Sequence, residues 1–229
     1  MKIFVIIPSG GSGIRAGSTL PKQYMQFGGK ELIAYTIDVF QQCGLIDEIT
    51  ISAQTEFLDL LKDIKEKFSF TKIKNIVEGG IDRQHSVFNA LTSLNASEDD
   101  LIIVHDAVRP LLPAAILIKS IETAKEFGSA VVAIKARDTL VRGSGSVISY
   151  AEREEFYYVQ TPQVFRYKIL LEAMRKSMSD NFMGTDESML VHRMGHSVKI
   201  VDGSFVNFKI TCQDDIKLFR LIAENKGGV

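Results

Sequence analysis

A glycine-rich loop near the amino terminus, which also carries two cations, is the part of this 229-residue sequence best suited to chemistry. Its glycines are Gly10, Gly11, Gly13 and Gly17. Because glycine has no Cβ and readily adopts positive φ, several backbone N–H groups of such a loop can converge on an anion. Arg15 and Lys22 add two positive charges to the same segment, SGGSGIRAGSTLPK. This composition predicts a polyphosphate-binding site.

Two commoner kinds of glycine loop fit the segment less well. A dinucleotide-binding fingerprint would place its third glycine where Ala16 stands, and an acidic residue on a second strand, where the sequence reads ITISAQT. A Walker loop would end in Gly-Lys-Ser or Gly-Lys-Thr, and the sequence has neither at this place. On the loop alone, an ordinary strand-to-helix turn with solvated charges stays open as an alternative.

A second candidate segment, VEGGIDRQHSVFNALTSL at residues 77–94, follows another expected strand. Gly80 lies in the turn, and Asp82 can cap the helix that the spacing of apolar residues predicts. Arg83 and Ser86 then lie one turn apart at the amino end of that helix. We predict that they contact a phosphate or a base edge. A solvated arginine and an ordinary helix-start serine are the alternative.

A third segment, LIIVHDAVRPLL at residues 101–112, again joins a buried strand to polar residues. Asp106 directly follows the strand, where enzymes that act on phosphates hold Mg²⁺ between a carboxylate and the substrate. Arg109 offers a second group for an anion, whereas nothing near His105 in sequence makes it a metal ligand. An Asp106–Arg109 ion pair that fixes the turn is the structural alternative, and both interpretations can hold together.

An alternation of strands and helices must position these segments. The expected order is strand 3–7, helix 32–40, strand 48–52, helix 56–68, strand 73–77, a helix after 82, strand 101–104 and strand 130–135. This order predicts an α/β, Rossmann-like fold, with a mostly parallel sheet covered by helices on both faces. Ligands of such sheets bind at the carboxyl ends of the strands. All three candidate segments follow strands and should therefore meet at that edge.

Composition narrows the class of protein. A hydrophobic content of 45% is enough for one large domain, which we take as residues 1–229. The net charge of −1 gives no general attraction to nucleic acid or to a membrane, and no apolar run approaches the ~20 residues of a membrane span. We therefore expect a cytoplasmic protein. Cys43 and Cys212 are too few for a disulfide framework.

Taken together in this order, the motifs resemble one family. They are SGGSGIR, PKQY, GGIDRQHSV, HDAVRP, ARDTL, QTPQ, TDES and NFKIT, and they extend over about residues 3–222. The sequence is similar to the polyol-phosphate cytidylyltransferases, above all to those that act on 2-C-methyl-D-erythritol 4-phosphate in the non-mevalonate isoprenoid pathway. One departure is Ser9-Gly10-Gly11, where the family usually has Ala-Ala-Gly. With a glycine at this place, the motif is also similar to that of the enzymes that act on ribitol 5-phosphate.

The resemblance implies a role for each matching residue. Catalytic roles, through stabilisation of the charge on the leaving pyrophosphate and on the acceptor phosphate, fall to Arg15, Lys22, Arg153 and Lys209. The residues implied around CTP are Ser9, Gly10, Gly11, Gly13, Gly80, Arg83, Ser86 and Ala107. Those implied around the polyol phosphate are Asp106, Arg109, Thr139, Thr161 and Asp186. Asp106 would also hold Mg²⁺, and the substrate's own phosphate would attack CTP, so no nucleophilic side chain is needed.

Residues 137–158 interrupt the alternation of strands and helices. Their GSG turn, flanked by alternating residues, predicts a β-hairpin arm that stands off the sheet. An isolated two-stranded arm is only marginally stable in water. In the resembled family the arm clasps a second subunit, which implies a homodimer. Thr139 and Arg153 lie on this arm.

Three alternatives stay open from the sequence. The first is a ribitol-5-phosphate cytidylyltransferase, which would share the CTP chemistry. The second is a sugar-1-phosphate nucleotidyltransferase, which leaves the HDAVRP turn and the arm unexplained. The third is a non-catalytic nucleotide-binding module, which would bind CTP without releasing pyrophosphate.

Overall fold

The computed structural model describes residues 1–11 and 20–226 of the chain. Three of the residues singled out above, Gly13, Arg15 and Gly17, lie outside these ranges. Within the described residues, no helix is long and apolar enough to cross a membrane. The cytoplasmic location stays a prediction.

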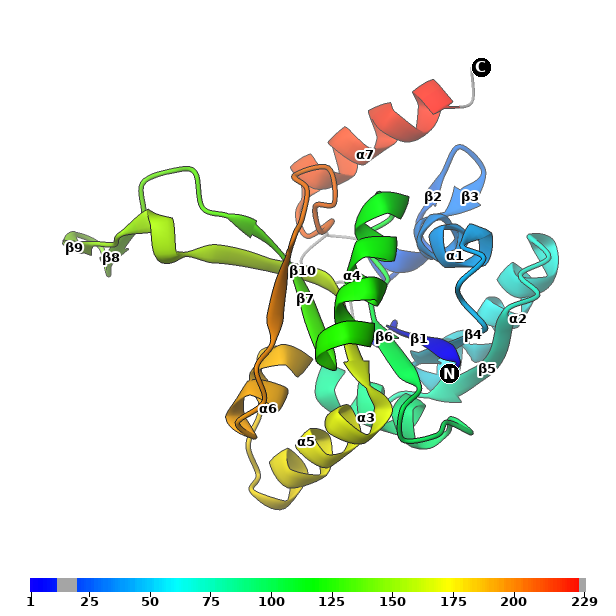
Figure 1. The fold of residues 1–229 in the computed structure, drawn as a ribbon. Coiled ribbons are helices and arrows are strands. Elements are labelled where there is room, and N and C mark those ends of the chain that lie inside the picture. The colour runs from blue at the N-terminus through cyan, green and yellow to red at the C-terminus, as the bar shows by residue number, and fades with distance from the viewer. Residues whose placement is uncertain (12–19, 227–229) are drawn as a thin grey trace.

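A seven-stranded sheet forms the centre of the described structure (Figure 1). Its order is β11-β7-β10-β6-β1-β4-β5. The strands are β1 (Ile3–Pro8), β4 (Glu48–Ala53), β5 (Ile73–Glu78), β6 (Leu101–Val104), β7 (Ser129–Lys135), β10 (Tyr157–Arg166) and β11 (Lys199–Asp202). Only β10 runs antiparallel to its neighbours in this sheet. The predicted α/β fold with a mostly parallel sheet is confirmed, whereas the antiparallel β10 was not predicted.

Helices cover both faces of the sheet, as expected. They are α1 (Leu32–Gln42), α2 (Leu58–Lys67), α3 (Arg83–Thr92), α4 (Ala114–Phe127), α5 (Tyr167–Ser179), α6 (Glu187–Arg193) and α7 (Gln213–Lys226). Buried side chains of α1, α2 and α4 form one apolar cluster with the sheet, and those of α3, α5 and α6 form another. A third cluster joins α7 to the small hairpin of β2 (Gln26–Phe27) and β3 (Lys30–Glu31).

The strand β1 belongs to both large clusters because its side chains alternate between the two faces. Ile3, Val5 and Ile7 lie in the cluster with α1, whereas Phe4 and Ile6 lie in the cluster with α3. All five side chains are at most 3% exposed. A strand buried on both faces reads as a continuous apolar run, which is why its prediction succeeded.

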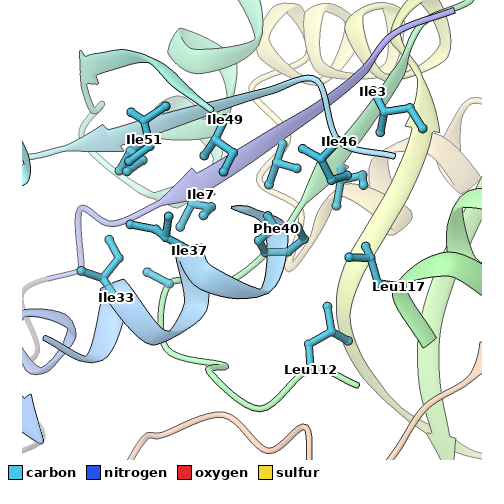
Figure 2. Packing of buried hydrophobic residues seen from close by; sticks show 14 of the residues in the cluster. Ile3, Ile7, Ile33, Ile37, Phe40, Ile46, Ile49, Ile51, Leu112 and Leu117 are labelled. Carbon is cyan, nitrogen blue, oxygen red and sulfur yellow. The ribbon is translucent and has the colours of Figure 1, made fainter. Parts of the chain in front are cut away.

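Figure 2 shows how α1 packs on one face of the sheet. Ile33, Ile37 and Phe40 recur at helical spacing and lie over Ile7 and neighbouring residues of the sheet. All of them are fully buried. This packing fixes α1, the first α-helix of the described chain, against β1.

The strand order reverses at β1. The chain continues from β1 to β4 and β5 on one side, then returns to place β6 on the other side of β1. In open α/β sheets, a crevice for ligands forms at such a reversal, outside the carboxyl ends of the strands. Ser9, Gly10 and Gly11 follow β1 and the HDAVRP turn follows β6, so both segments lie at this crevice.

The predicted hairpin arm is present. β8 (Val141–Gly143) and β9 (Val147–Tyr150) pair antiparallel and form a separate two-stranded sheet. Gly145, in the turn, has φ of +80°, a conformation that favours glycine. Figure 1 shows the arm extending away from the central sheet. The assignment of residues 1–229 to a single domain with an arm at 137–158 stays a prediction.

Candidate active site

A cavity of about 770 Å³ opens at the carboxyl ends of β1 and β6. Its lining is Pro8, Ser9, Gly10, Gly11, Lys22, Gln23, Gln54, Gly80, Ile81, Asp82, Arg83, Ser86, Asp106, Ala107, Val108, Lys209 and Thr211. The three candidate segments from the sequence therefore meet here, together with residues of the NFKIT motif. Its volume is in the range of pockets that enclose small-molecule ligands.

The first turn of the glycine loop is held by the PKQY motif. The amide of Gln23 donates to the carbonyl oxygens of Ser9 and Gly11, each at 2.8 Å. The hydroxyls of Ser9 and Tyr24 are 3.0 Å apart and hydrogen-bonded. Ser9, Gln23 and Tyr24 are all nearly fully buried, and burial raises the pKa of Tyr24 to about 12. Lys22 lies on the cavity from the same motif.

The start of α3 forms a second wall of the cavity. Asp82 caps the helix as predicted, because its carboxylate accepts from the backbone N–H of His85 at 2.9 Å. The Ser86 hydroxyl donates to the carbonyl of Asp82 at 2.8 Å and accepts from the N–H of Gly80 at 3.0 Å. Ser86 thus shapes the turn that leads into α3, in addition to lining the cavity.

Two glycines of the cavity differ in how much room they have. A Cβ at Gly80 would lie 2.2 Å from the Cβ of His85, so this position excludes any side chain without a shift of the backbone. A Cβ at Gly10 would lie 3.4 Å from the Ser86 hydroxyl, which is ordinary contact. There is therefore room for a Cβ at Gly10, the glycine that departs from the usual family motif.

Asp106 is the centre of the charged groups in the cavity. Its Oδ1 lies 3.4 Å from Nε of Arg83, and its Oδ2 lies 3.3 Å from Nε of Arg109 and 3.1 Å from Nζ of Lys209. Burial of Asp106 would raise its pKa, but the three cations outweigh this effect and hold the pKa well below its ordinary value. The Asp106–Arg109 pair predicted as a structural alternative is therefore present.

The contacts of Arg109 and Thr161 lie behind Asp106, and neither residue lines the cavity. Arg109 donates from its guanidinium to the carbonyl of Asn207 at 2.7 Å and so joins the HDAVRP turn to the NFKIT motif. The Thr161 hydroxyl accepts from the backbone N–H of Asp106 at 3.1 Å. Direct contact of these two residues with the acceptor stays a prediction. Their described contacts support the loops that carry Asp106 and Lys209.

His105 is buried beneath the same turn. Its Nδ1 lies 3.0 Å from the Thr161 hydroxyl and its Nε2 lies 3.1 Å from the carbonyl oxygen of Arg109. Since that carbonyl can only accept, Nε2 of the ring carries a hydrogen. Burial lowers the pKa of His105 to about 4. The histidine is a buried support of the turn.

The residues predicted to bind the acceptor do not all lie together in the structure of the single chain. Lys209 and Asp106 line the cavity. Asp186 caps α6 by accepting from the backbone N–H of Met189 at 2.8 Å, and it lines a smaller neighbouring cavity of about 210 Å³. Thr139 and Arg153 are exposed on or beside the arm, and neither contributes to the lining of either cavity.

Sequence reasoning missed several residues that shape the site. They are Gln23, Gln54, Asn207, Thr211 and Glu187. Glu187 makes a 2.6 Å ion pair with Arg83, and the amide of Asn207 donates to the carbonyl of Thr161 at 2.8 Å. Most of them lie inside the recognised PKQY, TDES and NFKIT motifs, next to residues that were chosen. For Gln23, Asn207 and Glu187 the missing signal was burial, which local sequence does not show.

Comparison with known proteins identifies the family that shares this site. The family model IspD, 2-C-methyl-D-erythritol 4-phosphate cytidylyltransferase, matches residues 3–225. A protein of that name from Geotalea uraniireducens is 38% identical over 221 residues, which are 95% of this chain and 95% of the relative. One from Geobacter metallireducens is 37% identical over an alignment of 230 positions that covers 99% of this chain and 99% of the relative.

Solved structures agree with the sequence comparisons. The structure of 4-diphosphocytidyl-2C-methyl-D-erythritol synthase from Anaerococcus prevotii has a TM-score of 0.84 and 29% identity, and the match covers 97% of this chain and 96% of that one. The 2-C-methyl-D-erythritol 4-phosphate cytidylyltransferase of Thermus thermophilus has a TM-score of 0.80 and 29% identity, covering 98% of this chain and 100% of that one.

These likenesses extend over nearly the whole chain, so they confirm the resemblance inferred from the motifs. They also favour methylerythritol phosphate over ribitol phosphate as the acceptor, because the matching family model and the relatives described above carry the methylerythritol name. The chain belongs to the 2-C-methyl-D-erythritol 4-phosphate cytidylyltransferase family, whose members are nucleotidyltransferases that use CTP.

Proposed function

We propose that the 770 Å³ cavity binds CTP and is the place where this enzyme transfers the cytidylyl group to 2-C-methyl-D-erythritol 4-phosphate. One observation carries the proposal: glycine backbone, the carboxylate of Asp106 and three cations line the same cavity. The cations are Lys22, Arg83 and Lys209. Such a set suits a triphosphate, whose negative charge needs several fixed positive partners.

The reaction needs positioning and charge stabilisation more than it needs a reactive side chain. An oxygen of the acceptor's phosphate attacks the α-phosphorus of CTP, and a new P–O bond forms. The bond from that phosphorus to the oxygen leading to the β-phosphate breaks, and its electron pair leaves with pyrophosphate. Lys22, with Arg15, would stabilise the charge on the leaving group, and Lys209 would hold the attacking phosphate.

Asp106 fits the role of a Mg²⁺ ligand. Among the described residues, no group of three or more His, Cys, Asp or Glu side chains could hold a metal by itself. Mg²⁺, however, is usually held by one or two carboxylates together with substrate phosphates and water. Asp106 lines the cavity and contacts two of the cations expected to hold those phosphates, Arg83 at 3.4 Å and Lys209 at 3.1 Å. When bound, the ion would neutralise charge on the phosphates of CTP.

The arm supports a homodimer in which each subunit serves the other's acceptor site. Its apolar side chains are exposed in the single chain: Val141 is 50%, Val147 56%, Ile148 62% and Tyr150 73% exposed. Apolar residues on a two-stranded hairpin gain stability when a partner covers them. A second subunit would cover them and would bring Thr139 and Arg153 to a cavity that they do not reach in their own chain.

Pyrophosphate release tests this function. CTP is mixed with Mg²⁺ and either methylerythritol phosphate, ribitol 5-phosphate or no acceptor. We expect release that depends on the acceptor, with kcat/KM at least about tenfold higher for methylerythritol phosphate, a difference of about 1.4 kcal/mol in transition-state binding. CTP binding without release would indicate a nucleotide-binding module, and a tenfold preference for ribitol 5-phosphate would overturn the acceptor.

A further inference from the structure

Glu187 is a carboxylate buried beside the proposed CTP cavity without lining it. It is the first residue of α6 and is 1% exposed. Its Oε1 accepts from the guanidinium of Arg83 at 2.6 Å. Its Oε2 is buried and has no hydrogen-bond partner within the described part of the chain. Removing a carboxylate from water carries a desolvation penalty, and a buried ion pair seldom stabilises a protein more than apolar packing would. The buried Glu187 therefore points to a role other than stability.

Arg83 is held unequally by its two carboxylates. The contact of its NH1 with Glu187, at 2.6 Å, is a short charge-assisted hydrogen bond. The contact of its Nε with Asp106, at 3.4 Å, is at the outer limit of hydrogen bonding. Burial would lower the pKa of Arg83, but Glu187 first and then Asp106 raise it. Glu187 is therefore the stronger anchor of this guanidinium.

Hydrogen bonds on two sides hold the segment around Glu187 in place. The backbone N–H of Ser188 donates to the amide oxygen of Gln163 at 2.9 Å, and the amide nitrogen of Gln163 donates to Asp186 at 3.1 Å. These bonds tie the start of α6 to β10. The amide oxygen of Gln84 accepts from the N–H of Gly184 at 2.9 Å, which ties the preceding loop to α3. Arg83 and Glu187 thus meet across two elements that have little freedom to move.

We propose that Glu187 is a positioning residue for CTP: it holds the Arg83 guanidinium at the cavity wall and keeps it from pairing more closely with Asp106, whose Oδ1 lies 3.4 Å from Nε. This inference rests on the proposed function, in which Arg83 binds CTP and Asp106 holds Mg²⁺. The side chain of Arg83 keeps 32% of its surface exposed and lines the cavity, so a ligand can reach it. If Glu187 lost its charge, Asp106 would be the remaining carboxylate partner of Arg83 in the described structure, and the guanidinium would shift toward it.

Glu187→Gln tests the proposal, because it removes the charge and preserves the shape. We expect KM for CTP to rise at least about tenfold, with kcat at saturating CTP within about threefold of wild type. Glu187→Asp, which keeps the charge on a shorter side chain, should give a smaller rise. The matched control is Glu31→Gln: Glu31 is also buried, at 5% exposed, and pairs with Lys67 at 3.0 Å, and neither residue lines the cavity. The control should lower Tm and leave KM unchanged.

The double variant Arg83→Ala/Glu187→Gln separates this inference from the proposed function. If Glu187 acts through Arg83, the double variant should have the KM for CTP of Arg83→Ala alone. If Arg83→Ala raises KM but Glu187→Gln changes only Tm, as the control does, the positioning role is wrong and the proposed CTP site stands. Multiplicative effects in the double variant would also overturn it. If Arg83→Ala leaves KM unchanged, the proposed role of Arg83 fails as well.

Discussion

The proposed CTP cavity and the hairpin arm differ in how far their own chain buries and hydrogen-bonds their side chains. In the cavity, Ser9, Gln23 and Asp106 are buried and their polar groups are hydrogen-bonded or paired within the chain. On the arm, every residue of β8 and β9 is exposed, and Arg153 contacts only the neighbouring arm segment among the described contacts. Only the cavity is preorganised by its own chain.

This difference separates two kinds of functional residue. Groups that must meet a developing charge at a fixed place gain from a rigid setting, because no reorganisation is needed during the reaction. Groups on a two-stranded arm cannot have such a setting until something packs against them. We therefore expect variants in the cavity to affect chemistry directly and variants on the arm to act through assembly.

The largest effect is expected for the cations of the glycine loop and the PKQY motif. Lys22→Ala and Arg15→Ala should each reduce kcat at least ~100-fold, as when one preorganised transition-state donor is removed, with smaller changes in KM for the acceptor. Lys62→Ala is the control, since Lys62 is an exposed lysine of α2 that pairs with Asp59. Steady-state kinetics give the answer. Turnover near that of wild type in either variant would remove that cation from the mechanism.

A smaller effect, on stability, should come from His105 below the cavity. Its pKa of about 4 in the folded protein is below its ordinary value of 6.5, so the unfolded chain binds more protons between these pH values. Stability should therefore fall as the pH drops from about 6.5 to about 4, by up to about 3 kcal/mol from this group. Urea unfolding across this range measures it.

His105→Gln should flatten that dependence. Glutamine has no titrating group here and can still donate to the carbonyl of Arg109, which the histidine contacts at 3.1 Å. The variant should lose less stability than wild type between pH 6.5 and pH 4. An equally steep loss in both proteins would show that groups other than His105 carry the pH dependence.

The smallest effect is expected at Gly10. Gly10→Ala places its Cβ in ordinary contact with Ser86, so kcat/KM should stay within about twofold and stability within about 0.5 kcal/mol of wild type. Gly80→Ala is the matched opposite, because its Cβ would clash with His85 and should cost about 1–3 kcal/mol. Equal effects at the two positions would contradict the described geometry of this wall.

The elements that could be predicted from the sequence are those with a continuous or strictly periodic apolar pattern. β6 was placed at its observed bounds, and the Asp82 cap of α3 was recognised from its position before the helix. The antiparallel β10 was missed, because pairing direction depends on the route of the chain and not on local pattern. The hairpin arm was found because its GSG turn interrupts the regular alternation.

The same distinction applies to the site residues. Those marked by the local sequence could be predicted, and those that depend on long-range contacts could not. Asp106 and Arg83 could be found because each directly follows a strand or a turn at the ligand edge of the sheet. Glu187 could not, because its partner Arg83 is 104 positions away in the sequence. Arg109 and Thr161 were predicted to contact the substrate, which stays a prediction, and their described contacts are with Asn207 and Asp106. Long-range packing decides which side of a loop a polar side chain faces.

The exchange of active-site parts between subunits is the central claim, and a mixed dimer tests it most directly. We expect Lys22→Ala to inactivate the cavity of its own chain and Arg153→Ala to remove the contribution of the arm. In a dimer of one chain of each kind, a shared site would combine the intact cavity of one chain with the intact arm of the other. Each variant alone is the control.

The measurement is the rate of pyrophosphate release after the two inactive variants are unfolded, mixed in equal amounts and refolded together. If each arm serves the other subunit, half of the dimers should regain one complete site, and the mixture should recover about a quarter of the wild-type activity. If the mixture stays as inactive as the separate variants although heterodimers form, the arm does not complete its partner's site and the account is contradicted.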